Sequence, residues 1–194
     1  MNLYIARHGE TEYNVKRLFQ GGTGDSPLTE NGKAQAQEMG RLMEGIPFDA
    51  IYSSPLQRAV GTVNLAFPNR SGIPFFTDER LVEILVGDMQ GMDWDEAEKL
   101  YPDAAGKMFT DPAGYIPPPK GETLEDMMQR IGSFLEDLAK KEYKNVFVQT
   151  HGYVLKVVYA WITEKNIAAI LKTPFYDNCA VVRYKYNGKW IEHA

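Results

Sequence analysis

The order of apolar and polar residues along the chain alternates between the periods of strands and helices. Short apolar runs predict strands at residues 2–6, 48–53, 75–77 and 145–150. Apolar residues at helical spacing predict helices at 27–44, from 54 onward, and at 93–101, 123–141 and 152–162. The last residues predict a hairpin that turns at Asn187-Gly188. The expected N-caps are Thr29, Ser54 and Asp93, the last in a capping box with Glu96.

Strands that alternate with helices predict an α/β fold. We expect three layers (α/β/α), in which helices cover both faces of a mostly parallel central sheet and the C-terminal hairpin adds an antiparallel edge. Residues 1–194 are expected to form a single domain, because this length suits one hydrophobic core. Residues 87–121 contain the sequence YIPPPKG and fit the alternation least, so they predict a small cap insertion over one end of the sheet.

Charge and composition narrow the functional classes. The formal net charge of −5 gives no overall field that would attract nucleic acid, so no such partner is expected. The chain has no apolar run that could span a membrane and no signal-peptide pattern, which predicts a cytoplasmic protein without a membrane partner. A single cysteine, Cys179, excludes an internal disulfide framework and fits a reducing compartment.

Polar residues with phosphate-binding chemistry follow three of the predicted strands. The first strand leads into Arg7-His8-Gly9, the second into Ser53-Ser54 with Arg58 one helical turn later, and the fourth into Thr150-His151-Gly152. Each of these residues alone is more often a loop or surface residue. Their meeting at the carboxyl edge of one sheet, where ligands collect in such folds, points to a shared site. Arginine forks and helix N-termini suit a phosphoryl group.

Two other site types are less consistent with these residues. His8, Glu10 and Glu12 alternate as metal ligands can, but the adjacent Arg7 would repel a cation, so we expect no metal and no cofactor. Residues 21–26 are rich in glycine but lack the Lys-Ser/Thr pair of a nucleotide-binding loop.

Six motifs together resemble the histidine phosphatase superfamily, the phosphoglycerate mutase-like proteins. They are RHGETEYN, GDSPLTENGKAQA, SSPLQRA, GETLEDMMQR, VQTHG and NCAVV, in the family's order. The resemblance implies a phosphoglycerate mutase-like fold in which His8 is the nucleophile and Arg7, Arg58 and His151 bind the phosphoryl oxygens. It also implies phosphate- or substrate-binding positions at Asn14, Gln20, Gly21 and Gly152.

The resemblance implies that Glu83 is the general acid. Glu79 competes on spacing grounds, but only Glu83 has a glycine, Gly87, at the matching offset. Three parts of the sequence depart from the family's pattern, and all three are expected to lie in the wall of the pocket. They are Leu18, a loop at 21–25 that is one residue longer than usual, and residues 85–91.

The resulting functional prediction is a metal-independent phosphomonoester hydrolase that forms a phosphohistidine on a small phosphorylated metabolite, as a monomer or homodimer. A cofactor-dependent phosphoglycerate mutase is the main alternative, and a non-catalytic module that binds a phospho-ligand is another. The insertion contains lysines but no arginine, which favours hydrolysis. Candidates for contacting a second anionic group of the substrate are Tyr115, Lys120, Lys16 and Arg17.

Overall fold

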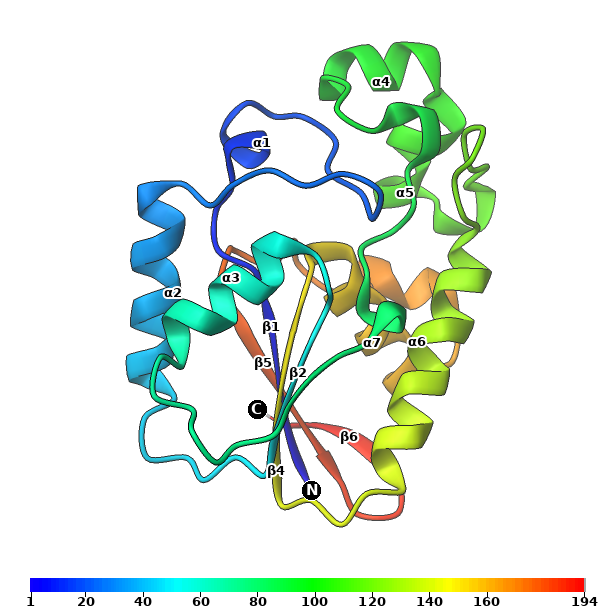
Figure 1. Cartoon of the computed structure of the whole chain (residues 1–194). Coiled ribbons are helices and arrows are strands. Elements are labelled where there is room, and N and C mark those ends of the chain that lie inside the picture. Colours follow the sequence, from blue (N-terminus) through cyan, green and yellow to red (C-terminus); the bar gives the residue numbers. More distant parts are fainter. Residues whose placement is uncertain (194) are drawn as a thin grey trace.

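A six-stranded sheet with the strand order β3-β2-β4-β1-β5-β6 forms the centre of the molecule (Figure 1). The computed structural model describes residues 1–193. The strands are β1 (Asn2–Arg7), β2 (Ala50–Ser53), β3 (Phe75–Thr77), β4 (Asn145–Thr150), β5 (Val181–Tyr186) and β6 (Trp190–His193). The first four strands in the sheet order run parallel, and β5 and β6 add an antiparallel hairpin beside β1. The predicted mixed sheet with an antiparallel edge is confirmed.

Helices cover both faces of this sheet, which confirms the three-layer arrangement. Helices α2 (Glu30–Leu42) and α3 (Gln57–Ala66) lie on one face, and α6 (Leu124–Ala139) and α7 (Gly152–Thr163) on the other (Figure 1). Alternate residues of β1 serve the two faces: Leu3 and Ile5 belong to the α6–α7 core, and Ala6 belongs to the α2–α3 core. A strand buried on both faces has no polar face, which explains why β1 and β4 read as nearly continuous apolar runs.

The helix boundaries follow the capping residues, with one exception. Thr29 caps α2, so this helix begins at Glu30 and not at residue 27 as predicted. Thr123 caps α6. The Asp93 carboxylate accepts hydrogen bonds from the first turn of the short helix that begins at Trp94. The prediction that Ser54 caps a helix was wrong. Helix α3 begins three residues later without a side-chain cap, and the Ser54 hydroxyl instead lies 2.7 Å from Nε2 of His151.

The insertion at 87–121 lies above the carboxyl ends of the strands (Figure 1). It contains two short helices, α4 (Trp94–Leu100) and α5 (Lys107–Thr110), joined by a π-helical turn at Pro102–Gly106. Short 3-10 turns occur at Gly87–Met89 and Pro112–Gly114, and elsewhere at Glu79–Leu81 and Ile167–Lys172. Ala97, Ala104 and Met108 are buried in the same apolar cluster as the β1 residues, so the insertion shares the main core. Within residues 1–193, no helix has the length and apolar character needed to cross a bilayer.

Candidate active site

The sheet topology brings the predicted strand-end residues together. Strand β4 lies between β1 and β2, with Arg7 beside Thr150 and Ser53 beside Gln149 in the parallel registers. The residues that follow these strands are therefore neighbours. The ring centroids of His8, after β1, and His151, after β4, lie 5.3 Å apart.

His8 is a buried, neutral imidazole. Only 4% of the residue is exposed, and Nδ1 lies 2.8 Å from the main-chain oxygen of Gly9. Because a carbonyl can only accept, Nδ1 carries the ring proton and Nε2 carries the lone pair. Burial holds the pKa of His8 well below its ordinary value, and the charges of Arg58 and Arg7 lower it further. The lone pair on Nε2 is therefore available for nucleophilic attack.

Gly9 after this histidine is required by close packing. A Cβ atom at Gly9 would lie 2.5 Å from the main-chain oxygen of Gly32 in α2. The amide of Gly9 also donates to the Thr62 hydroxyl of α3. The turn after β1 is therefore held against both helices of that face, which fixes the direction of the His8 ring.

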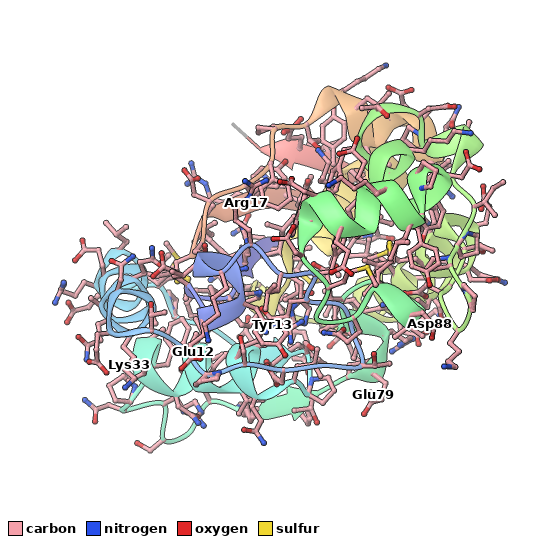
Figure 2. All side chains as sticks on the ribbon, turned by 90° about the horizontal axis from the view of Figure 1, so that it is seen from above. Glu12, Tyr13, Arg17, Lys33, Glu79 and Asp88 are labelled. Atoms are coloured by element: carbon pink, nitrogen blue, oxygen red, sulfur yellow. The ribbon has the colours of Figure 1, made fainter. Side chains whose placement is uncertain are left out.

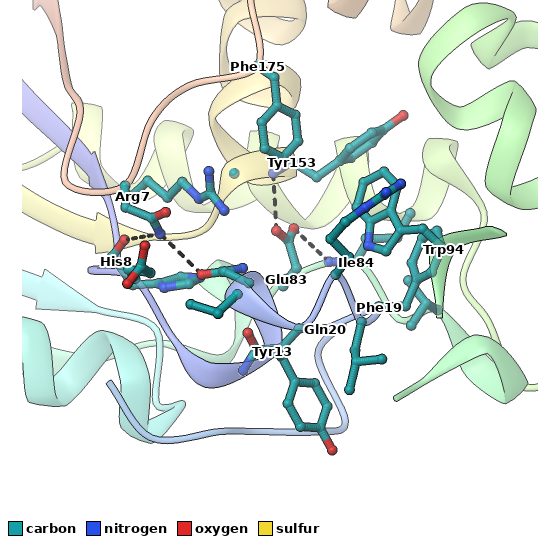
Figure 3. Close-up of a pocket in the computed structure, with 18 of the residues that line it drawn as sticks. Arg7, His8, Tyr13, Phe19, Gln20, Glu83, Ile84, Trp94, Tyr153 and Phe175 are labelled. Carbon is teal, nitrogen blue, oxygen red and sulfur yellow. Dashed lines mark hydrogen bonds between the residues drawn. The ribbon is translucent and has the colours of Figure 1, made fainter. Parts of the chain in front are cut away.

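Arg7 is held over the pocket by its surroundings. Its Nη1 donates to the carbonyl of Tyr176 at 2.7 Å, and its guanidinium lies 4.9 Å from the centroid of the Phe175 ring (Figure 3). Gly152 leaves room for it, since a Cβ there would lie 3.3 Å from Arg7 Nε. Burial lowers the pKa of Arg7, but an arginine keeps its charge. The buried Nε atom has no hydrogen-bond partner in the described structure.

Arg58 reaches the same place from α3 and is only 1% exposed. Its Nη atoms donate to the carbonyls of Gly24 and Gly21, and Nη1 forms an ion pair of 3.1 Å with Asp25. Burial lowers its pKa, and the Asp25 carboxylate opposes this shift. As in Arg7, the buried Nε has no partner within residues 1–193.

His151 supplies a third unpaired nitrogen. The residue is fully buried, and its Nε2 lies 2.7 Å from the Ser54 hydroxyl. The other ring nitrogen, Nδ1, is buried and lacks a partner in the part of the chain that the structure describes; it is a donor in the tautomer in which the Ser54 hydroxyl donates to Nε2. Burial holds the pKa of His151 well below its ordinary value, so the ring is neutral.

Leaving buried donors unpaired costs about 1–3 kcal/mol each. This cost applies to three nitrogens near the His8 ring: Nε of Arg7, Nε of Arg58 and Nδ1 of His151. An anion with several oxygens would pair them at once. The arrangement is therefore suited to a phosphoryl group at the Nε2 atom of His8.

Glu83 is the carboxylate that reaches this group. It is 8% exposed, and its two oxygens accept hydrogen bonds from the main-chain amides of Ile84 (3.0 Å) and Tyr153 (3.1 Å) (Figure 3). Burial raises the pKa of Glu83, although these two bonds and the charges of Arg58 and Arg7 oppose the shift. The competitor Glu79 is exposed and lies at the periphery of the molecule (Figure 2).

The other predicted binding residues divide into two groups. Asn14 and Gln20 line the pocket, and Gln20 is held by hydrogen bonds with Thr11 and Ser26. Gly21 does not line the pocket, and neither do the buried Arg58 and His151, but Gly21 has no side chain that could reach a ligand. Its carbonyl accepts from Arg58, so its loop supports the arginine from behind.

The site also contains residues to which the sequence analysis gave no role. Asn178, in the motif NCAVV, donates from Nδ2 to the His8 carbonyl at 3.0 Å and to Asn14 Oδ1 at 3.3 Å. The next amide, of Cys179, donates to the Arg7 carbonyl. The motif itself was recognisable, but only the structure shows that it ties the strand end carrying Arg7 and His8.

The pocket has a volume of about 550 Å³, and an aromatic wall faces the charged residues. Phe19 stacks on Trp94 at 4.7 Å between centroids (Figure 3). Trp94 in turn stacks on Phe109 of the insertion at 5.5 Å. Met108 and Phe175 extend this wall. The large apolar surface on the outer side of the pocket was not predicted.

Of the four candidates for a second anion contact, only Arg17 lines the pocket. It lies at the rim, where it pairs with Asp95 at 3.3 Å (Figure 2). Lys16 pairs with Glu12, and Lys120 pairs with Asp88 outside the pocket lining. Tyr115 is packed against the main core, where burial raises the pKa of its hydroxyl.

The sequence profile of the histidine phosphatase superfamily (branch 1) matches residues 3–192. The chain belongs to the histidine phosphatase superfamily. A Hydrogenobacter thermophilus protein, whose name gives phosphoserine phosphatase 2 as a provisional assignment, is 34% identical over 161 residues, which cover 83% of this chain and 78% of the relative. The 2,3-bisphosphoglycerate-dependent phosphoglycerate mutase of Nitrobacter winogradskyi is 32% identical over 193 residues, covering 95% and 91%. The solved structure of Bacillus stearothermophilus YhfR has a TM-score of 0.91 at 34% identity, covering 98% of this chain and 94% of that one.

Proposed function

We propose that this protein is a metal-independent phosphomonoester hydrolase that forms a phosphohistidine on His8 and acts on a small phosphorylated metabolite. The observation that carries the proposal is the set of three unpaired, buried nitrogen donors on Arg7, Arg58 and His151 beside a neutral imidazole. The two arginines supply the positive charge that a metal ion provides in other phosphoryl-transfer sites.

In the first step, the lone pair on Nε2 of His8 attacks phosphorus, and the bond from phosphorus to the ester oxygen breaks. The three donors hold the phosphoryl oxygens, so charge stabilisation and positioning supply most of the catalysis. Protonated Glu83 gives its proton to the leaving oxygen, which departs as an alcohol. Such proton transfer contributes roughly 10²- to 10⁴-fold in rate.

In the second step, the carboxylate of Glu83 accepts a proton from water as the water oxygen attacks phosphorus. The bond from Nε2 to phosphorus breaks, and its electron pair returns to the ring of His8. Inorganic phosphate leaves, and Glu83 is protonated again for the next cycle. Splitting one displacement into two easier steps is the advantage of the covalent route.

The insertion favours hydrolysis over mutase chemistry. A mutase must hold a second phosphate or carboxylate while the phosphoryl group is transferred back. The insertion has no arginine in its sequence, Lys107 and Lys120 pair with Asp103 and Asp88, and the wall it gives to the pocket is aromatic. The similarity to a phosphoglycerate mutase keeps this activity as the second candidate.

The test is release of inorganic phosphate from phosphoserine, 3-phosphoglycerate and p-nitrophenyl phosphate in the presence of EDTA, with His8→Ala as the matched variant. We expect release by the wild-type protein alone. Isomerisation of 3-phosphoglycerate without net release would replace the proposal by the mutase. Binding of these esters by both proteins with no turnover would leave only a binding module.

A further inference from the structure

We propose that the ion pair between Glu122 and Arg130 positions the general acid Glu83, an inference that rests on the proposed hydrolase function. The pair lies in the motif GETLEDMMQR, with Glu122 just before α6 and Arg130 within it. It is bidentate: Nη2 of Arg130 lies 2.6 Å from Oε1 of Glu122, and Nε lies 3.0 Å from Oε2. Both side chains are largely buried, with 21% of Arg130 and 10% of Glu122 exposed.

The segment that carries Glu83 relies largely on side chains for its main-chain hydrogen bonds, although the amides of Gly22 and Glu122 bind the carbonyls of Ile84 and Leu85. Residues 80–85 begin in a single 3-10 turn and belong to no strand, so their carbonyls have no partner strand to accept hydrogen bonds from. Nη1 of Arg130 donates to the carbonyls of Arg80 and Val82, both at 2.7 Å, and Nη2 lies 3.4 Å from the carbonyl of Glu83. One guanidinium thus binds three of the six carbonyls in this segment, those of two residues before the acid and of the acid itself.

Glu122 fixes the other end of the same segment. Its Oε1 accepts from the amide of Leu85 at 2.9 Å, and its own amide donates to the Leu85 carbonyl at 2.9 Å. Glu83 therefore lies between two anchors, one just before α6 and one within it. Its carboxylate turns the other way, into the pocket, where the amides of Ile84 and Tyr153 orient it (Figure 3).

This geometry separates proton transfer from phosphate binding. The hydrogen bonds of Arg130 go to main-chain carbonyls and to Glu122, whereas the phosphoryl oxygens fall to Arg7, Arg58 and His151. Loss of Arg130 would release the segment around Glu83, and a shift of about 1 Å at a reacting group can cost roughly 10²-fold in rate. The phosphate donors come from other elements. The contacts that join those elements to this segment, from the Gly22 amide to the Ile84 carbonyl and from the Thr150 hydroxyl to the Leu81 carbonyl, do not involve Arg130 and should be kept.

The test uses two ester classes that differ in their need for an acid. An alkyl ester such as phosphoserine needs a proton on its leaving oxygen, whereas 2,4-dinitrophenyl phosphate does not. For Arg130→Met, we expect kcat/KM to fall about 10²-fold for phosphoserine and less than about threefold for the dinitrophenyl ester. In a Glu83→Gln background, the same change should cost less than about threefold for either ester, because Arg130 acts through Glu83.

Two further variants complete the design. Arg80→Met is the matched control, since Arg80 lies on the same segment but pairs with Asp78 and Asp137 away from the pocket, and both esters should be unaffected. Arg130→Lys keeps the charge opposite Glu122, but one ammonium cannot reach three carbonyls. We therefore expect a smaller loss of kcat/KM, confined to phosphoserine. This variant keeps the test valid if Arg130→Met does not fold.

Equal losses for both esters, or an undiminished further loss in the Glu83→Gln background, would overturn the positioning role alone. A wild-type protein that hydrolyses neither ester would overturn the proposed function and this inference with it.

Discussion

Replacing Arg58 by Met should remove most of the stabilisation that inorganic phosphate gives to the folded protein. Among residues 1–193, the Nε atoms of Arg7 and Arg58 and Nδ1 of His151 are buried and have no hydrogen-bond partner. Phosphate can pair all three, and it binds this site only when the chain is folded. The stability of the protein should therefore rise with phosphate concentration.

The expected size follows from the contacts. At a phosphate concentration 100 times the Kd, the gain is about 2.7 kcal/mol. For a chain of this length, that corresponds to a rise in Tm of roughly 5–11 °C. A hydrogen bond to a charged group contributes about 1.5–3 kcal/mol, so loss of the Arg58 donor should weaken binding roughly 10- to 150-fold. If the Kd rises about 100-fold, the gain at the same concentration falls to about 0.4 kcal/mol, or roughly 1 °C.

The assay is thermal unfolding with and without phosphate, and the shift in Tm is the quantity compared. Using the shift matters because Arg58→Met also leaves Asp25 without its ion pair and lowers the Tm of the free protein. Arg41→Met is the matched control, since Arg41 is exposed on α2 and pairs only with Glu38 in the described structure. A full phosphate shift in Arg58→Met would refute the role of this guanidinium. No shift in the wild-type protein would refute the anion site itself.

Three other changes should have separate effects. Gly9→Ala should lower the free energy of unfolding in urea by about 1–3 kcal/mol, because its Cβ would lie 2.5 Å from α2. Gly61 lies within α3 and its Cβ would make only ordinary contacts, so Gly61→Ala should raise that free energy by about 0.5–1 kcal/mol. Lys156→Met removes the hydrogen bonds from the buried ammonium to the hydroxyl and the carbonyl of Thr173. Thr173 lies three residues before Tyr176, whose carbonyl holds Arg7, so phosphate binding measured by calorimetry should weaken about tenfold. Glu83→Gln should remove the alkaline limb from the pH profile of kcat/KM for an alkyl phosphate; an unchanged limb would assign that limb to another group.

Much of the fold could be read from the sequence because its strands are buried on both faces. The apolar runs of β1 and β4 and the stripe of α6 reflect burial in one core, which local periodicity records directly. The boundaries were less accurate where tertiary contacts compete with local signals. Ser54 followed by a proline is a typical helix start, but its hydroxyl is bonded to His151, almost one hundred residues away in sequence.

The same distinction holds in the site. His8 and His151 could be found because each follows a strand and precedes a glycine, and parallel strands end at one edge. Glu122 and Arg130 could be recognised only as part of a motif, since Arg130 binds main-chain carbonyls and the Glu122 carboxylate binds a main-chain amide, and neither has a sequence signature. The aromatic wall has the same difficulty, because Trp94 and Phe109 lie in an irregular insertion whose position over the pocket depends on packing.

Burial is the largest influence on the pKa of both proton-handling residues, and it acts on them in opposite directions. The charged form of His8 is the protonated ring, so burial lowers its pKa, and the charged form of Glu83 is the carboxylate, so burial raises its pKa. Burial therefore favours the uncharged form of both groups, the neutral ring that attacks and the carboxylic acid that gives up its proton. Arg7 and Arg58 lower both pKa values, and a bound phosphoryl group would cancel much of their effect on Glu83. The alkaline limb, which appears as Glu83 loses its proton, should therefore lie at higher pH in the single-turnover rate of the first step, which reports the complex, than in kcat/KM, which reports the free enzyme. Coincident limbs would mean that the arginine charges do not reach the acid.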